Sequence, residues 1–228
     1  MTGKTVTDDG DLQALLRLMA WLSPAFPVGS FAYSGGLESA VHDGLVGDST
    51  GLEDWIAALV RHGSVWNDAV LLVEAHRAGG DMARLAAVAE LAEALAGSKE
   101  RHGETMLLGD AFLSAAVAWA HGIFSALPAR MAYPVAVVAV AGAHGISAEK
   151  AVAAFLHALT SQMVSAGIRL GVSGQKDGVA ILARLEVLLA DTARRAAQST
   201  LDDLGSASMQ ADMASLRHET QGTRLFRS

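Results

Sequence analysis

The sequence predicts an all-α protein, a single domain resembling a helical bundle of about 8–10 helices with flexible ends. Apolar residues recur at helical spacing along most of the chain, and the alternating pattern of strands is missing. A length of 228 residues suits one domain with a sizeable core. We divide the chain into a flexible N-terminal segment (1–10), an all-helical domain (11–204) and a C-terminal partner-docking tail (205–228).

Capping residues mark the expected helix starts in the first part of the chain. Asp11 is expected to cap the first helix, which ends before Pro24 because proline disfavours helical geometry in the preceding residue. Ser34 is expected to cap a second helix. Thr50 and Glu53 have the spacing of a capping box and predict a third.

The later helices are marked by similar signals. Their predicted starts are Asn67 or Asp68, Asp81, Ser98, Ser147 and Val179. The helix from Ser98 is expected to continue toward Phe124, and the one from Ser147 to reach about Leu170. Residues 171–178, GVSGQKDG, read as a glycine-rich turn before the last long helix.

Composition excludes several classes of protein. The chain has no cysteine, so disulfides and thiolate chemistry are excluded and a reducing, cytoplasmic location is expected. The N-terminus lacks the pattern of a secretory or transit peptide. The net charge of -7 and the scattered positions of the cationic residues argue against binding to nucleic acid.

Three successive uncharged stretches are long enough to span a membrane: 111–129, 131–148 and 151–168. They are built mainly on alanine and are interrupted by histidine, proline, glycine and glutamine. Buried helices of a soluble protein are therefore favoured over membrane spans.

Motifs for catalysis or for metal binding are missing from the sequence. It contains no P-loop string and no GxSxG elbow, and no two histidines stand three or four residues apart. Asp202 and Asp203 are expected to be a solvated pair. The sequence therefore predicts no enzyme, no catalytic residue and no metal or cofactor bound through a local motif.

Two segments suggest contacts with another chain. Gly35 and Gly36 fall at a helix start, where they serve either as a tight entry or as bare backbone that a second chain or ligand approaches closely. Residues 205–228 are polar, carry three arginines against two acidic residues, and end in LFRS. Such a tail is expected to be mobile alone and to become ordered on a partner.

Four strings occur in order along the chain: LSPAFPVGSFAYSGGLE, KERHGETMLLG, GIRLGVSGQKDG and RHETQGTRLFRS. Together they resemble the urease accessory protein F family over nearly the whole length. The resemblance implies a non-catalytic helical scaffold, usually a homodimer. It would join accessory protein D, called H in some organisms, to the GTPase accessory protein G, and would act on apo-urease. Nickel would be handled by the assembled complex, and the scaffold would modulate the GTPase.

The resemblance also implies the partner-binding residues. Those near the N-terminus are Phe31, Tyr33, Ser34, Gly35, Gly36 and Glu38, and those in the tail are Arg217, His218, Glu219, Arg224, Leu225, Phe226 and Arg227. Leu225 and Phe226 are expected to be buried anchors in the partner, with Arg224 making a charge-assisted contact. Because relatives carry bulkier or polar residues at position 35, side-chain contacts from Gly35 are in doubt.

A third group is implied to face the GTPase: Arg169, Gln175, Lys176 and Asp177. Arg169 invites comparison with an arginine finger, which stabilises phosphoryl-transfer charge from another chain. A plain scaffold contact is favoured, because a family position that can carry lysine would not supply the same bidentate geometry.

Two other interpretations remain open. An α-helical enzyme could bind a ligand in a pocket between its helices. A membrane protein could use the three uncharged stretches.

Overall fold

The computed structural model describes residues 5–228 and is all-α, which confirms the predicted fold class. Within these residues there is no strand. The α-helices are α1 (Thr5–Trp21), α2 (Leu37–His42), α3 (Ser49–His62), α4 (Ser64–Ala78), α5 (Met82–Ala94), α6 (Lys99–Ala116), α7 (Tyr133–Ala143), α8 (Ala148–Arg169), α9 (Gln175–Ala196) and α10 (Met209–His218). Three 3₁₀ helices join them: η1 (Ser30–Ala32), η2 (Gly122–Ser125) and η3 (Leu201–Asp203).

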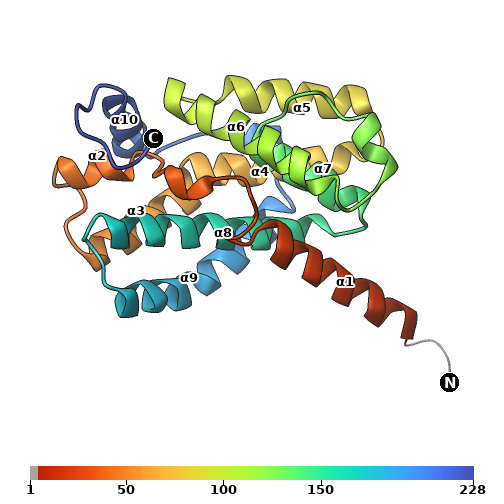
Figure 1. The fold of residues 1–228 in the computed structure, drawn as a ribbon, viewed down its shortest axis with the longest axis horizontal. Helices are drawn as coiled ribbons and strands as arrows, with labels where there is room; N and C mark the ends of the chain where they lie inside the picture. Colours follow the sequence, from red (N-terminus) through yellow and green to blue (C-terminus); the bar gives the residue numbers. More distant parts are fainter. Residues whose placement is uncertain (1–4) are drawn as a thin grey trace.

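Helix α4 lies at the centre of the fold and contacts α3, α5, α7, α8 and α9. Most of its side chains are buried, from Val65 to Ala78. The long helices α8 and α9 pack against each other and against α3, and α5, α6 and α7 cover the other side of α4 (Figure 1). One apolar core runs through all of these contacts.

Local capping signals predict some helix starts correctly. Asp81, Ser98 and Ser147 each accept a hydrogen bond from a backbone N–H in the first turn of α5, α6 and α8. The predicted extent of the helix after Ser147 is also confirmed, because α8 ends at Arg169 and Leu170 is its C-cap.

Other predicted starts are wrong by a few residues. Helix α3 is capped by Asp48, whose carboxylate accepts the N–H of Gly51 at 2.8 Å, so Thr50 lies inside the first turn. Glu53, the expected partner in a capping box, instead pairs with Arg184 of α9 at 2.7 Å. A long-range ion pair thus takes the place of the local motif.

The start and end of three more helices differ from the predictions. Helix α4 begins at Ser64, before Asn67 and Asp68, and α9 begins at Gln175 instead of Val179. Helix α6 ends at Ala116, and the segment up to Phe124 turns through η2. The turn predicted at 171–178 is therefore shorter, since Gln175 to Gly178 already belong to α9.

Helix α1 extends from the body of the molecule (Figure 1). It begins at Thr5, before the predicted cap Asp11, whose carboxylate instead pairs with Lys150 of α8 at 2.8 Å. Of the flexible segment predicted for residues 1–10, residues 1–4 lie outside the described part of the chain, and the rest are helical.

The three uncharged stretches form different structures. The stretch 111–129 is divided between α6 and η2, and 131–148 contains α7, which is only 11 residues long. Among the described residues only α8 is long and apolar enough to span a membrane, and half of its most apolar window is buried in the protein. Since α8 packs against α3, α4, α7 and α9, it is a core helix here.

Candidate functional site: the C-terminal tail on the glycine segment

The C-terminal tail lies against the segment around the two glycines within the single chain. Helix α10 packs on α2, and the residues after it run along η1 (Figure 1). The backbone N–H of Arg227 donates to the carbonyl of Ala32 at 2.8 Å, and that of Ser34 donates to the carbonyl of Ser228 at 2.9 Å. In this structure the tail therefore lies on its own chain, and its ordering on a partner stays a prediction.

Gly35 and Gly36 differ in the space available for a side chain. Both have positive φ, +61° at Gly35 and +83° at Gly36, a region that other residues adopt at a cost. A Cβ on Gly36 would lie 2.8 Å from the backbone nitrogen of Ser215 in α10, while one on Gly35 would meet nothing within 4 Å. The bare backbone at Gly36 thus admits α10 of the same chain.

Glu38 is the main acceptor for the tail. Its buried carboxylate accepts the backbone N–H groups of Leu225 at 2.6 Å and Phe226 at 2.9 Å, and it lies 3.0 Å from Nε2 of His218. Burial raises the pKa of Glu38, but the hydrogen bonds from these donors outweigh it and hold the pKa below its ordinary value of 4.5. The site is therefore built around an ionised glutamate.

His218, at the end of α10, lies between two carboxylates. Its ring is fully buried, with Nε2 facing Glu38 and Nδ1 lying 2.6 Å from Glu100 of α6. Glu100 also pairs with Arg224 of the tail. We call these four side chains, Glu38, Glu100, His218 and Arg224, the tail lock.

The aromatic residue of the tail, Phe226, packs against its own chain. Phe226 is only 4% exposed, and the guanidinium of Arg169 lies 4.2 Å from the centre of its ring. Arg169 also donates to the carbonyl of Phe31. Phe226 is thus placed as an internal anchor, and the guanidinium of Arg169 ties η1 to the tail.

The end of the tail contacts a cluster of buried charged side chains. The hydroxyl of Ser228 donates to Glu104 of α6 at 2.9 Å, and Arg101 pairs with both Glu104 and Asp68. Burial raises the pKa of Glu104 and of Asp68, although the charge of Arg101 opposes this. Neither Arg101 nor Asp68 was expected from the sequence to support the tail.

The remaining residues expected at the site lie in different places. Tyr33 and Ser34 are buried, Phe31 is 70% exposed, and Leu225 is 54% exposed. Arg217 pairs with Asp43 at 2.9 Å, and the carboxylate of Glu219 accepts the backbone N–H of Lys99 at 2.8 Å. Arg227 is exposed.

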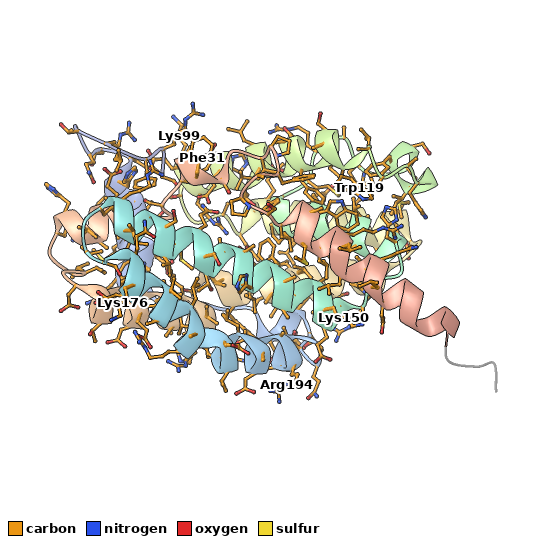
Figure 2. The ribbon with its side chains drawn as sticks, turned by 60° about the horizontal axis from the view of Figure 1, so that its bottom comes forward. Phe31, Lys99, Trp119, Lys150, Lys176 and Arg194 are labelled. Atoms are coloured by element: carbon orange, nitrogen blue, oxygen red, sulfur yellow. The ribbon has the colours of Figure 1, made fainter. Side chains whose placement is uncertain are left out.

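The third expected group is separate from the tail. Gln175, Lys176 and Asp177 are exposed in the first turn of α9. Figure 2 shows Lys176 well apart from Phe31. The structure therefore brings the N-terminal and C-terminal groups together with Arg169 and leaves this turn as a different surface.

Two features of the site were missed in the sequence. The stretch KERHGETMLLG carries Glu100, Arg101 and Glu104, but no local pattern reveals that they meet the tail. Helix α10 also exposes an apolar stripe, formed by Met209, Met213 and Leu216 at helical spacing.

No group of three or more histidine, aspartate and glutamate side chains in the described residues could hold a metal ion. A cavity of about 400 Å³ lies between the helices beside the tail, lined in part by Ser34, Arg101 and Ser215.

Comparison with known proteins identifies the family. The UreF family model matches residues 46–186. The urease accessory protein UreF of Rhizobium leguminosarum bv. trifolii is 70% identical over 223 residues, covering 98% of this chain and all of that protein. The proteins of the same name from Agrobacterium fabrum and Rhizobium meliloti are 62% identical over 220 residues and 58% identical over 223. They cover 96% and 98% of this chain, and 99% and 100% of their own length.

The sequence resemblance is thereby confirmed over almost the full chain, and the interpretation as an enzyme with an interhelical pocket is set aside. The chain belongs to the UreF family, whose members are non-enzymatic accessory proteins of urease maturation.

Proposed function

We propose that the protein is a scaffold that joins accessory protein D, or H, to the GTPase accessory protein G, for GTP-dependent delivery of nickel to apo-urease in the cytoplasm. The observation that carries the proposal is the surface built by the tail and η1. It presents apolar side chains on a fixed backbone, which favours docking of another protein.

The exposed residues of this surface have the character of an interface. Phe31 and Leu225 are exposed, and α10 adds the exposed side chains of Met209, Met213 and Leu216. Arg227 and Lys99, which are exposed, contribute positive charge in a chain whose net charge is -7. Aromatic, methionine and arginine side chains are enriched in interface cores, so we assign accessory protein D to this surface.

The first turn of α9 supports a second docking surface, for the GTPase. Gln175, Lys176 and Asp177 are exposed there and separate from the tail. Arg169 is engaged with Phe31 and Phe226, which favours a structural contact over a role as an arginine finger. A measurement of GTP turnover in the assembled complex would show whether the scaffold activates or restrains the GTPase.

Helix α1 supports a homodimer. Its residues Leu12, Leu15, Leu16 and Met19 are exposed, and a groove of about 680 Å³ with mostly apolar walls lies between α1 and α8. An exposed apolar stripe beside an apolar groove suits a symmetric pairing in which each α1 packs on the other copy. In this proposal nickel is carried by the assembled complex and not by this chain alone.

Light scattering after size-exclusion chromatography tests the docking surface. The protein is mixed with accessory proteins D and G, with and without GTP and nickel, as wild type and as the double variant Phe31→Ala and Leu225→Ala. Both side chains are exposed, so the fold should be kept while co-elution with D is lost. The control is Val187→Ala, on an exposed position of α9. Undiminished co-elution of the double variant would contradict the assigned surface.

A further inference from the structure

We propose that the protein carries a further interaction surface, a groove between the ends of α3 and α9 that binds an acidic segment of a partner protein. We call it the arginine groove, and Arg61, Trp66 and Arg195 are the residues that define it. The proposal goes beyond the proposed function, because the groove uses none of the side chains assigned to accessory protein D or to the GTPase.

The arginine groove is far from the first turn of α9. Arg195 follows Gln175 by 20 positions in the same helix, which corresponds to about 30 Å along its axis. Figure 2 shows Lys176 and Arg194 near opposite ends of α9. A partner held at the groove would therefore contact a different part of the molecule from the one proposed for the GTPase.

The groove is open to solvent and has a volume of about 600 Å³. Its walls come from the end of α3, the end of α9 and the connection between η3 and α10. This connection is fastened to the body, because Nε1–H of Trp66 donates to the carbonyl of Asp203 and the N–H of Ala207 donates to the carbonyl of His62, both at 2.8 Å. The fold thus holds the groove on three sides.

The side chain of Arg195 is held over the ring of Trp66. Its guanidinium carbon lies 3.6 Å from the ring centre, and one guanidinium nitrogen donates to the carbonyl of Arg61 at 3.0 Å. Stacking on an aromatic face leaves the edge of a guanidinium, with its other N–H donors, available to a carboxylate. Because the planar group is positioned in advance, it loses less conformational entropy on binding than a free side chain.

Positive charge exceeds negative charge in the groove. Among the described residues, neither Arg61 nor Arg195 forms an ion pair, whereas the neighbouring Arg194 pairs with Asp191. Of the described residues that line the groove, only Asp203 has a carboxylate, and this group accepts a backbone N–H in its own capping box. Basic residues at a helix end offset the helix dipole, but Arg195 spends one donor on a helix carbonyl and keeps the others.

The form of the groove favours a peptide segment over a small anion. A single ion pair at an exposed position contributes little, so a small free anion would be held weakly. An acidic segment can contact Arg61 and Arg195 at once, and the exposed side chains of His62 and Gln198 add hydrogen-bonding groups along the same groove. In a chain whose net charge is -7, this local excess of positive charge would also steer an acidic segment to one place.

Binding of a fluorescent hexaglutamate peptide to the full-length protein, followed by anisotropy at low ionic strength, tests the proposal. The wild type should bind, and its affinity should fall as salt is added. Arg195→Gln should weaken binding about tenfold or more, because charge-assisted hydrogen bonds are lost. Arg195→Lys keeps the charge without the planar fork and should recover only part of the affinity.

Arg194→Gln is the matched control. It removes the same charge one position away, from an exposed side chain paired with Asp191, and should change the affinity by no more than about twofold. If Arg195→Gln does not fold, Arg61→Gln serves instead and should also weaken binding. Arg61 is exposed, and its hydrogen bond with Arg195 uses only its backbone carbonyl.

Three results would overturn the proposal. The first is a wild-type protein that does not bind the peptide at low salt. The second is equal weakening in Arg194→Gln and Arg195→Gln, which would show that only the total charge matters. The third is displacement of the peptide by an equal concentration of inorganic phosphate, which would identify a site for a small anion instead of a protein segment.

Discussion

The two ends of the chain are held in opposite ways. Helix α1 extends from the body with much of its apolar stripe exposed, and its described polar contact with the rest of the chain is the exposed pair between Asp11 and Lys150. The tail has fewer apolar residues but is fixed by buried carboxylates and backbone hydrogen bonds. An apolar stripe suits a permanent partner, whereas a hydrogen-bonded surface can be presented to a changing one.

Removing the aromatic anchor of the tail should have the largest effect on stability. Phe226→Ala deletes a buried ring and should lower the free energy of unfolding by about 3–5 kcal/mol. Leu225→Ala, at the exposed neighbour, should change it by no more than about 0.5 kcal/mol. Urea unfolding of both variants measures the difference, and equal losses would show that the tail is not packed as described.

Gly36 tests the close approach of α10. Gly36→Ala should cost about 2–4 kcal/mol, since it combines a left-handed backbone with a clash against Ser215. Gly35→Ala meets open space and should cost only the backbone strain, about 1–2 kcal/mol. Thermal unfolding of the two variants compares their losses of stability. A larger loss for Gly35→Ala than for Gly36→Ala would contradict the close approach of α10 to Gly36.

Acid should weaken the hydrogen bonds that hold the tail. The pKa of Glu38 is lower in the folded chain than its ordinary value of 4.5. Its contribution to stability is therefore present above pH 4.5 and is lost as the pH falls through the lowered value. The amide chemical shifts of Leu225 and Phe226, followed by NMR during an acid titration, should change with a midpoint below 4.5. A midpoint at or above 4.5 would contradict the described hydrogen bonds.

Polar substitutions on α1 should change assembly with the smallest effect on the fold. Leu16→Gln and Met19→Gln replace exposed side chains, so the folded single chain should lose no more than about 0.5 kcal/mol. Light scattering should nevertheless show the mass fall from that of a pair to that of one chain. Val179→Gln, exposed on α9, is the control, and a wild-type protein that is already monomeric would reject the α1 interface.

Sequence reasoning succeeded at three helix starts where the capping residue is local and unambiguous. Asp81, Ser98 and Ser147 were identified as caps because a capping side chain and its N–H donor lie within a few residues. It failed at Thr50, where Asp48 competes for the same helix start. The pair of glycines indicated a close approach, but not that Gly36 meets the same chain.

The tail lock could not be predicted from local pattern. Glu38 and His218 are separated by 180 positions, and Glu100 lies in a helix between them. The family resemblance supplied the segments that matter, including the one that holds Glu100, but not the pairing of their side chains. The packing of α10 on both α2 and α6 brings these charges together.

Helix α8 gives the molecule a fixed internal distance. Near its start, Lys150 pairs with α1, and at its end Arg169 contacts the tail, with 22 residues in the helix. At 1.5 Å per residue its length is about 33 Å. Since α8 is packed in the core on several sides, this span should change little when either end is occupied. In a symmetric pair joined through α1, it would set how far apart the two copies of the tail stand, and so the size of the partner that can bridge them.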